Sequence, residues 1–559
     1  MAMLLAENLR LREENLQLLQ ESLSNRRLAG HYKSFHERAT ERLTEAGKQI
    51  EALKAKVTEL THRLFGRKSE RFNLESSAPA QNAPKRPRGQ QRGAAGHGRK
   101  LRGDLPVVEV VLEPPAAQMI CGCCGKSREP WGEPEVSEQI EWEVRMFRRR
   151  TSRMKYRRAG GCACGDGGPR IVCAPPPVSL IPKGLLGISF IVEALLLKYL
   201  YATPLHRILA MTRRAGMPLS AGTLCGVLEK ITPLFAPLYE AIHARSRRED
   251  LALMDETRWA VFIEEKAKSS HRWWLWVVVT GMTRLYILSP SRSAAVPKEY
   301  FGYEAESGGV AWHKQVMVDR YKAYEFLKDQ LELAYCWAHV RRDFLEARRD
   351  LKDRAWADGW IEEIGALYRL NKTRVALGRV QNGPCELPAP FVQLDPQRLL
   401  SPEYRHADTL LRGGVEKMAA ARLAALAGED LRTPRRKILQ SLENHWRGLT
   451  IFVAQPQIPM DNNGAERAAR PAAVARKNFY GSGSKWSGDL LVMLFTLLQT
   501  LLLHKSDPRK YLTAYLQACA NNGSRPPADL TCWLPWNFAT SQAGSGDSGT
   551  QINPAARAP

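Results

Sequence analysis

The sequence has no uninterrupted apolar run of about 18 residues, the length that a membrane-spanning helix needs. Its N-terminus also lacks the apolar core of a secretory signal and leads directly into charged residues. These two absences predict a cytoplasmic protein without a membrane partner. The eleven cysteines are then expected to stay reduced, so that metal binding is favoured over disulfide formation.

Acidic residues are few relative to basic ones. The chain of 559 residues has 58 Asp and Glu against 82 Lys and Arg, which gives a formal net charge of +24. This excess predicts a polyanionic partner, nucleic acid first, although a role in solubility would also explain it. A chain of this length is expected to form several domains.

The N-terminal segment, residues 1–75, has apolar residues at coiled-coil spacing. Leu9, Leu16 and Leu23 lie seven residues apart, and a second series with the same spacing occupies residues 43–64. Such spacing predicts a coiled coil. It favours self-association into a homo-oligomer over a hairpin within one chain.

Two segments have compositions that predict disorder. Residues 76–105 are rich in Ala, Pro, Gly, Gln and basic residues, and form either a linker that neutralises phosphates or a plain spacer. Residues 541–559 consist largely of Gly, Ser, Ala and Pro and are expected to form a disordered tail.

Residues 106–174 contain two cysteine pairs, Cys121-x-x-Cys124 and Cys162-x-Cys164. Four thiolates from two such pairs are typical of a structural zinc site, so we expect Zn²⁺ in a small module here. Free or buried thiols are the alternative. The spare candidate ligands are Cys123 and Cys173.

Basic residues with interleaved aromatic residues follow the first cysteine pair. This composition is typical of a ribbon that contacts DNA. The candidate DNA-binding residues in this stretch are Arg148, Arg149, Arg150, Arg157 and Arg158.

Three acidic residues far apart in the sequence stand out. Asp255 and Asp319 each follow a short apolar run of the kind that forms a buried strand. A carboxylate at the end of such a strand is costly unless it is paired or binds a cation. Glu466 lies in the first turns of a helix that the N-capping signal Asp461-Asn462-Asn463 predicts.

Brought together, the three carboxylates would repel one another unless divalent cations neutralised them. Two hard cations held about 3.5–4 Å apart by carboxylate oxygens can activate an attacking oxygen and stabilise a leaving one at phosphorus. We therefore expect Mg²⁺ or Mn²⁺ at Asp255, Asp319 and Glu466. The alternative for Glu466 is a solvated ion pair with a neighbouring arginine.

The order of elements around these acids predicts an α+β core. Residues 249–350 contain three strands, a helix, a strand, a helix and a strand, an order that fits a ribonuclease-H-like α/β sheet. In that fold the first and fourth strands lie side by side, which would bring Asp255 and Asp319 together. The core is expected to resume at 460–505, where the apolar run Leu490–Leu503 predicts a helix too short to span a bilayer.

Helical segments are expected around this core. Residues 175–248 resemble a helix-turn-helix region, with one helix ending near Arg214 and the next near Ile231. Residues 351–459 form a predicted helical insertion, and 506–540 a C-terminal extension.

Cys336-x-x-His339 directly follows the last core strand. This pair is half of a zinc site or, as we favour, a buried cysteine with a hydrogen-bonding histidine near the acids. Contact of the histidine with a DNA phosphate is a further alternative. The candidate DNA-binding residues in this part of the chain are His339, Arg341, Arg342, Arg467, Arg470, Arg476 and Lys477.

Taken together, the motifs resemble those of transposases of the insertion sequence 66 family. The matching stretches are Leu64-Phe65-Gly66-Arg67-Lys68-Ser69-Glu70, Leu180-Ile181-Pro182-Lys183-Gly184, Asp255-Glu256-Thr257, Asp319-x-Tyr321-x-x-Tyr324, Cys336-x-x-His339-x-Arg341-Arg342, Asp461-Asn462-Asn463-x-x-Glu466-Arg467, Arg476-Lys477-Asn478 and Leu534-Pro535-Trp536. The resemblance implies a multidomain α+β protein with a coiled coil, a zinc module and a ribonuclease-H-like core. It also implies that Asp255, Asp319 and Glu466 are an Asp-Asp-Glu catalytic triad. The chain departs from the family's pattern at the Cys162-x-Cys164 pair and at Arg320, where the family usually has Gly.

The resemblance implies a bacterial enzyme that cleaves and transfers DNA strands at the ends of a mobile element. Its partners would be double-stranded DNA, both terminal repeats and target, and companion proteins of the same element. Two other functions use the same features: a non-catalytic DNA-binding regulator of transposition, and a structure-specific nuclease without strand transfer. The presence of all three acids in order argues against the regulator.

Overall fold

The computed structural model describes residues 3–26, 146–157, 171–263, 271–304, 309–310, 315–328, 331–380, 389–428 and 431–538, with a few single residues between 28 and 127. The chain divides into two compact units, residues 1–137 and 138–559, which we describe separately.

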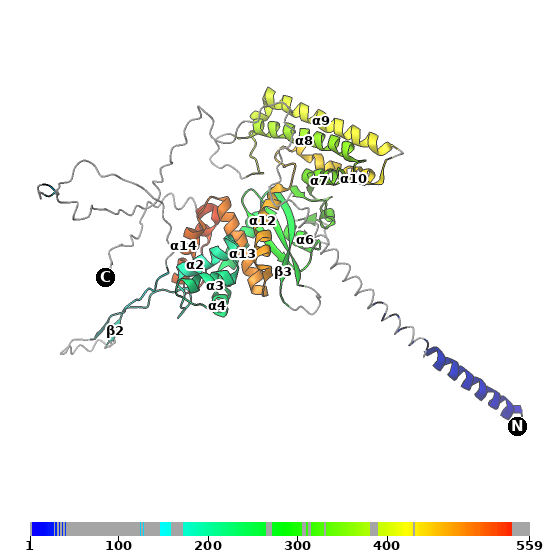
Figure 1. Ribbon diagram of the computed structural model, residues 1–559, viewed down its shortest axis with the longest axis horizontal. Coiled ribbons are helices and arrows are strands. Elements are labelled where there is room, and N and C mark those ends of the chain that lie inside the picture. The colour runs from blue at the N-terminus through cyan, green and yellow to red at the C-terminus, as the bar shows by residue number, and fades with distance from the viewer. Residues whose placement is uncertain are drawn as a thin grey trace. The chain divides into compact units, whose positions relative to one another are not determined.

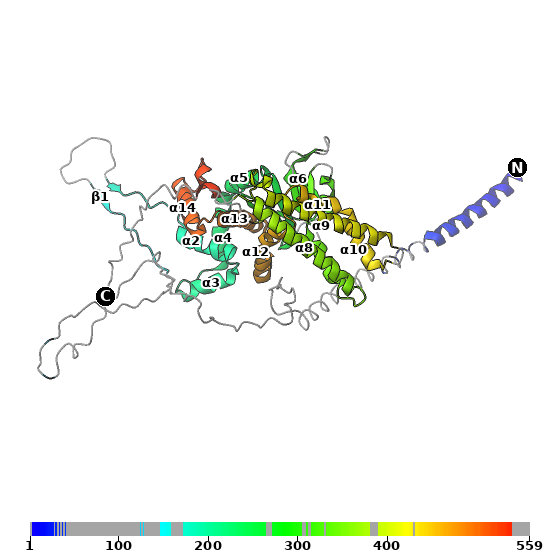
Figure 2. The same ribbon diagram turned by 90° about the horizontal axis from the view of Figure 1, so that it is seen from above.

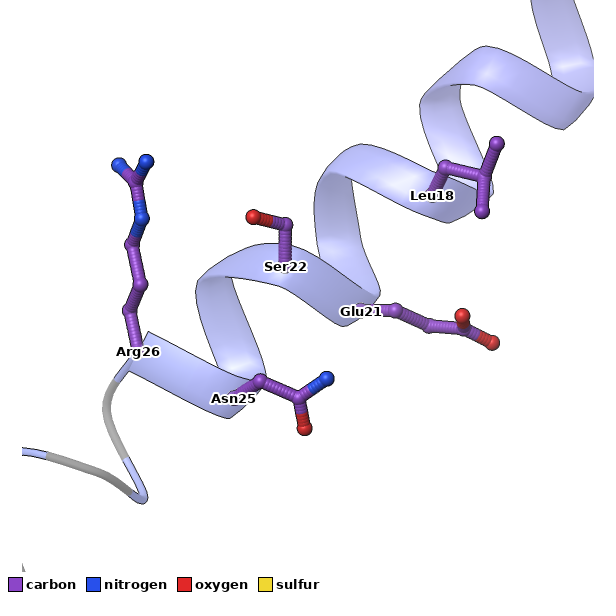
Figure 3. Close-up of a pocket in the computed structure, with 5 residues that line it drawn as sticks. All are labelled: Leu18, Glu21, Ser22, Asn25 and Arg26. Carbon is purple, nitrogen blue, oxygen red and sulfur yellow. The ribbon is translucent and has the colours of Figure 1, made fainter.

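In the first unit, residues 3–26 form one helix (Figure 1). Leu9, Leu16 and Leu23 are 60%, 62% and 50% exposed on it, as expected of a seam without its partner. The helix is confirmed over this range, whereas its pairing with a second chain stays a prediction. A hollow on its surface is formed by side chains of this helix alone, so it indicates no binding site (Figure 3). The side chains around it are Leu18, Glu21, Ser22, Asn25 and Arg26.

The second unit begins with a small antiparallel ribbon, β1 (Lys155–Arg157) and β2 (Ile171–Cys173). Helical elements follow: α2 (Ile188–Leu195), the π-helix η2 (Leu196–Leu200), α3 (Leu205–Arg214), α4 (Ala221–Ile231), the 3₁₀-helix η3 (Thr232–Phe235) and α5 (Ala236–Arg247). The two helices predicted as a helix-turn-helix are α3 and α4. Between them Gly216 adopts φ +80°, a left-handed conformation that glycine tolerates best, and the Ser220 hydroxyl caps α4 by accepting from Thr223 N at 3.1 Å.

A mixed sheet lies at the centre of the unit. Its main strands are β3 (Leu251–Val261), β4 (Arg272–Val279), β5 (Arg284–Ser289), β8 (Gln315–Val318) and β9 (Glu332–Tyr335), in the order β5-β4-β3-β8-β9. β3, β4 and β5 pair antiparallel, whereas β3, β8 and β9 pair parallel. The prediction that the first and fourth of these strands lie side by side is therefore confirmed. The short strand β10 (Gly481–Ser482) pairs in parallel with the far end of β3.

Smaller elements connect these strands. After β5 come α6 (Ala295–Phe301) and the paired strands β6 (Tyr303–Glu304) and β7 (Gly309–Val310). The predicted helix between β8 and β9 is the 3₁₀-helix η4 (Lys322–Leu327), and α7 (Trp337–Ala347) follows β9.

Two helices cover the sheet, α12 (Asn463–Phe479) against β3 and β4, and α13 (Lys485–Leu503) against β5 (Figure 1). β5 is an edge strand, and threonines of α13 satisfy its backbone. Thr496 Oγ1 accepts from Tyr286 N at 3.0 Å, and Thr500 Oγ1 accepts from Arg284 N at 3.2 Å. Residues four apart share one face of a helix, so both threonines reach the same strand.

The predicted start of the apolar helix Leu490–Leu503, and with it the prediction that this helix is too short to span a bilayer, was wrong. We expected an apolar helix from Leu490, but α13 begins at Lys485 because Ser484 and Ser487 form a capping box. Its 19 residues are long and apolar enough to cross a membrane, but 61% of the apolar window is buried inside the fold. This burial is typical of a helix in the core of a fold, so α13 is not read as a membrane span.

The range predicted as a helical insertion contains α8 (Arg354–Gly378), η5 (Arg398–Leu400), α9 (Pro402–Ala427), α10 (Thr433–Asn444) and α11 (Trp446–Ala454). α8 and α9 lie side by side (Figures 1 and 2). Beyond the core, α14 (Pro508–Asn521) packs against α2, and η6 (Thr531–Trp533) follows.

A buried arginine joins three helices of the insertion, α8, α9 and α11. Arg374, in α8, is fully buried and donates to Asp408 Oδ1 of α9 at 2.8 Å. It also donates to the carbonyl oxygens of Phe452 and Val453, at 2.6 and 2.8 Å. These carbonyls are at the C-terminal end of α11, where helix groups lack intrahelical partners and a positive charge is stabilising.

Close packing of α11 on β9 gives a first prediction. A Cβ atom at Gly448 would stand 2.6 Å from the Tyr335 ring and against the Leu333 carbonyl oxygen. Gly448→Ala is therefore expected to lower the free energy of unfolding by about 1–3 kcal/mol, measured by urea denaturation.

Gly413→Ala, in α9, is the matched control. No atom lies within 4 Å of a Cβ at that position. This change should leave stability unaltered or raise it by up to about 1 kcal/mol, because alanine has the higher helix propensity. Equal destabilisation by both variants would contradict the packing argument.

Candidate active site

The pairing of β3 with β8 brings two of the acids near each other. Leu251 pairs with Gln315 and Leu253 with Met317, where the ladder ends, and Asp255 and Asp319 each follow two residues further along. Side chains alternate along a strand, so both acids lie on the face that carries Leu253 and Met317. Neighbouring strands are about 4.8 Å apart, which makes the two carboxylates neighbours.

The third acid reaches the same face from α12. A Cβ at Gly464 would stand 2.8 Å from Leu253 Cδ2, so the start of α12 lies directly on the strand that carries Asp255. Glu466 follows two residues later, and its charge raises the pKa of Asp255. Sequence positions 255, 319 and 466 therefore meet at one face of the sheet.

The environment of Asp255 disfavours its ionised form. Burial, foremost, and then the charges of Glu256, Asp319 and Glu466 raise the pKa of Asp255 to about 7. One hydrogen bond opposes this effect, from Glu256 N to Asp255 Oδ1 at 2.9 Å. A carboxyl group shifted in this way, by burial first and by neighbouring acids second, marks a candidate functional site.

Glu256, the next residue along β3, is compensated. Because strand residues alternate, its side chain leaves the opposite face, where it is 1% exposed. Its Oε1 accepts from Arg292 Nε at 2.7 Å and its Oε2 from the Tyr324 hydroxyl at 3.2 Å. Burial, followed by the charge of Asp319, raises the pKa of Glu256.

Arg292 also connects this pair to the loop of Asp319, a contact that sequence reasoning missed. Its guanidinium lies 3.8 Å from the centre of the Tyr321 ring, and the Tyr321 hydroxyl donates to the Arg292 carbonyl oxygen at 2.9 Å. Tyr321 N in turn donates to Asp319 Oδ1 at 3.0 Å. The strand alternation at 255 and 256 was the available signal, since it sends adjacent acids to different partners.

Two residues of α7 approach Glu466. His339 Nε2 lies 3.8 Å and Arg342 Nη2 3.9 Å from Glu466 Oε1. Burial, and next the charge of Arg342, lower the pKa of His339. The favoured interpretation of the Cys336-x-x-His339 pair is thus consistent with a fully buried Cys336, whose thiol pKa burial raises to about 11.

The structure describes the residues of the predicted Mg²⁺ or Mn²⁺ site but not the four predicted zinc ligands. Within its described part, no group of three or more His, Cys, Asp and Glu side chains is gathered closely enough to hold an ion. The donors at the three acids are nonetheless carboxylate oxygens, which suit Mg²⁺ or Mn²⁺, and the pKa of Asp255 is raised first by burial and then by the charges of Glu256, Asp319 and Glu466. The predicted zinc ligands lie outside the described residues: Cys121, Cys124, Cys162 and Cys164. Of the spare thiols, Cys123 is exposed and Cys173 lies in β2.

The candidate DNA-binding residues differ in their exposure. Those exposed to solvent are Arg148, Arg149, Arg150, Arg342, Arg467, Arg470 and Lys477, and Arg157 lies in β1. Arg341 is half-buried, and Arg158 lies outside the described residues. Arg476 is engaged with β3, since its Nη1 donates to Thr257 Oγ1 at 3.1 Å and to the Arg258 carbonyl oxygen at 2.6 Å. Arg320, the departure from the family pattern, donates to Ser441 Oγ at 2.7 Å and pairs with Asp343.

The fold and the site together define a strongly basic α+β protein with an acidic site on one face of a mixed sheet. The model of the family described as Transposase IS66 family matches residues 183–490, and the chain belongs to this family. The matched range includes all three acids, the whole sheet and the helical insertion. Membership indicates a transposase, a protein whose substrate is DNA.

Similar proteins occur in Sinorhizobium fredii. The uncharacterised protein y4jD is 25% identical over 554 residues, which cover 91% of this chain and 99% of y4jD. The uncharacterised protein y4qI is 26% identical over 477 residues, or 83% of this chain and 80% of its own. A third, the uncharacterised protein y4hP, is 25% identical over 79% of this chain and 76% of its own.

The electrostatics of Asp255 give a second prediction. Its pKa is about 7 in the fold and near its ordinary 3.8 in the unfolded chain, so the fold binds more protons between these values. Stability of the metal-free protein should therefore fall as pH rises through this window. Asp255→Asn removes the effect and is expected to raise the free energy of unfolding by on the order of 2 kcal/mol at about pH 8.

Urea denaturation in EDTA at several pH values would measure this difference. The advantage of Asp255→Asn should shrink towards about pH 5, because the wild-type carboxyl group is by then mostly protonated in the fold. A difference that stays constant with pH would show that Asp255 is not destabilised by its neighbours.

Proposed function

We propose that this chain is an Asp-Asp-Glu transposase, which cleaves and joins DNA strands at the ends of a bacterial insertion sequence. The observation that carries the proposal is the convergence of Asp255, Asp319 and Glu466 on one face of the sheet. The strand order β5-β4-β3-β8-β9, with its antiparallel first half and parallel second half, supports a ribonuclease-H-like core.

In this proposal the three carboxylates hold Mg²⁺ or Mn²⁺. Such cations activate the attacking oxygen and stabilise the leaving oxygen of a phosphodiester. The side chains of Asp255 and Asp319 are held on paired strands, and Glu466 closes the site from α12. His339 and Arg342 flank Glu466 and limit its movement.

The proposed reaction has two displacements at phosphorus. Water first attacks a phosphodiester at the end of the element, which breaks the strand and leaves a 3′-hydroxyl group. That hydroxyl then loses its proton and attacks a phosphodiester of the target DNA, which forms a new strand junction and releases a target 3′-hydroxyl. The exposed arginines nearest the third acid, Arg342, Arg467 and Arg470, would grip phosphates and so fix the position of the DNA.

The N-terminal parts complete the proposal. Cys121, Cys124, Cys162 and Cys164 would hold a structural Zn²⁺ ion, and the exposed leucines of the first helix would pair with those of a second chain. Two copies would bring two element ends together. The expected compartment is the bacterial cytoplasm, where the DNA is.

Cleavage and joining of labelled DNA that carries the element ends test the proposed function. Asp255→Asn, Asp319→Asn and Glu466→Gln should each lower the rate of joined-product formation in Mg²⁺ by more than about 100-fold, because each removes a metal ligand. EDTA should abolish the products.

Asp489→Asn is the matched control for these variants. Asp489 pairs with Lys485 on the exposed side of α13, so its loss should leave the rate unchanged. Wild-type cleavage by Glu466→Gln would contradict the assignment of the third acid. Tight binding without cleavage by the wild-type protein would indicate a regulator, and cleavage without joining would indicate a nuclease.

Self-association gives a separate prediction. Leu16→Glu puts a charge into the seam of Leu9, Leu16 and Leu23, and should shift the full-length chain towards monomer in light-scattering measurements. Leu11→Glu, outside that seam, should leave the oligomer intact. The same shift in both variants would refute this seam.

A further inference from the structure

Two residues that are neither acids nor bases connect the three acid-bearing segments. We propose that Asn462, acting together with Cys336, is a positioning residue that sets the spacing of Asp255, Asp319 and Glu466. This inference rests on the proposed function and deepens it, since it says what holds the three acids at their separation.

The first connection joins Asn462 to β3. The side chain of Asn462 is fully buried, and its Nδ2 donates to the Met254 carbonyl oxygen at 2.6 Å. Met254 directly precedes Asp255. The pairing of β3 with β8 ends at Leu253, so Asn462 binds β3 just where its ladder with β8 stops. A hydrogen bond in such a water-free place holds its partners firmly.

The second connection reaches β8 through Cys336. Asn462 N donates to Cys336 Sγ at 3.1 Å, and Cys336 N donates to the Val318 carbonyl oxygen at 3.2 Å. Val318 directly precedes Asp319. Two consecutive hydrogen bonds thus relate Asn462 to the strand of the second acid, and both residues are fully buried.

The third connection is within α12. Glu466 N donates to the Asn462 carbonyl oxygen at 3.1 Å, as one of the first hydrogen bonds of the helix. Glu466 is therefore fixed to Asn462 by the helix backbone. Asn462 is therefore linked to all three segments. Its backbone carbonyl binds α12, which carries Glu466, and its side-chain amide binds β3, which carries Asp255. Through the thiol of Cys336 it is linked to β8, which precedes Asp319.

The fold has other contacts at the same place that do not depend on the Asn462 side chain. Trp337 N donates to the Met460 carbonyl oxygen at 2.9 Å, and Gly464 packs on Leu253. Loss of the Asn462 amide should therefore leave α12 on the sheet but free to shift. Shifts of about 1 Å at a reacting site are sufficient to reduce rates strongly.

The test measures strand cleavage against Mg²⁺ concentration for the full-length chain. Asn462→Asp keeps the shape of the side chain but removes the Nδ2 donor to the Met254 carbonyl oxygen. Asn462→Ala removes both the side-chain shape and this donor. Each should lower the cleavage rate by about 10–100-fold and raise the Mg²⁺ concentration for half-maximal rate, as loss of residues that orient metal ligands does. Binding of the same DNA in EDTA should be unchanged, because no phosphate contact is altered.

Cys336 supplies a second pair of variants in case the Asn462 variants fail to fold. Cys336→Ser retains an acceptor for Asn462 N and should stay within about 3-fold of wild type, whereas Cys336→Ala leaves that N–H unpaired and should behave like Asn462→Ala. Cys519→Ala is the matched control, because Cys519 is a buried thiol in α14, away from the acids. It should leave the Mg²⁺ dependence unchanged.

The outcomes separate this inference from the proposed function. If Asp255→Asn abolishes cleavage while Asn462→Ala shows wild-type Mg²⁺ dependence, the positioning role is wrong and the proposed function stands. Equal effects of Cys336→Ser, Cys336→Ala and Cys519→Ala on the cleavage rate and on DNA binding would also refute the positioning role, because they would indicate a general loss of stability. If Asp255→Asn cleaves like wild type, the proposed function fails, and the positioning role fails with it.

Discussion

The parallel pairing of β3 with β8 is the constraint on which the rest of the site depends. β3 pairs with β4 on one side and with β8 on the other, and its pairing with β8 brings Asp319 to the side of Asp255. A slip by one residue would turn Asp319 to the opposite face of the sheet. The apolar residues of both strands prevent that slip, because their burial fixes the faces. The hydrophobic core therefore specifies the acidic site.

The adjacent acids Asp255 and Glu256 of β3 have different surroundings. Glu256 is buried with Arg292 and Tyr324 as partners, so its charge is compensated within the protein. Asp255, on the other face, is surrounded by further acids, and its pKa rises to about 7. Burial raises the pKa of both carboxyl groups, but only Glu256 has an arginine and a tyrosine hydroxyl as partners. A buried carboxyl group among other acids marks a candidate functional site.

The sequence predicted those parts of the fold that have local signals. Apolar runs before Asp255 and Asp319 indicated the strands, and Gly216 marked the turn between α3 and α4. The start of α13 was missed because its first turn is polar and only the capping box of Ser484 defines it. The contact of Asn462 with Met254 joins positions 208 residues apart and leaves no periodic pattern. The four predicted zinc ligands and most of the coiled coil lie outside the described residues and stay predictions.

The order of the elements along the chain has a consequence for biosynthesis. α12 and α13, which cover the sheet, follow the helical insertion and so leave the ribosome long after the strands. Until then the sheet has two acids and an apolar face without its cover. The third acid and that cover arrive together, on consecutive helices. A nascent chain therefore gains its third acid only as its apolar face begins to be covered, and termination before α12 would yield a protein that lacks Glu466 and is prone to aggregate.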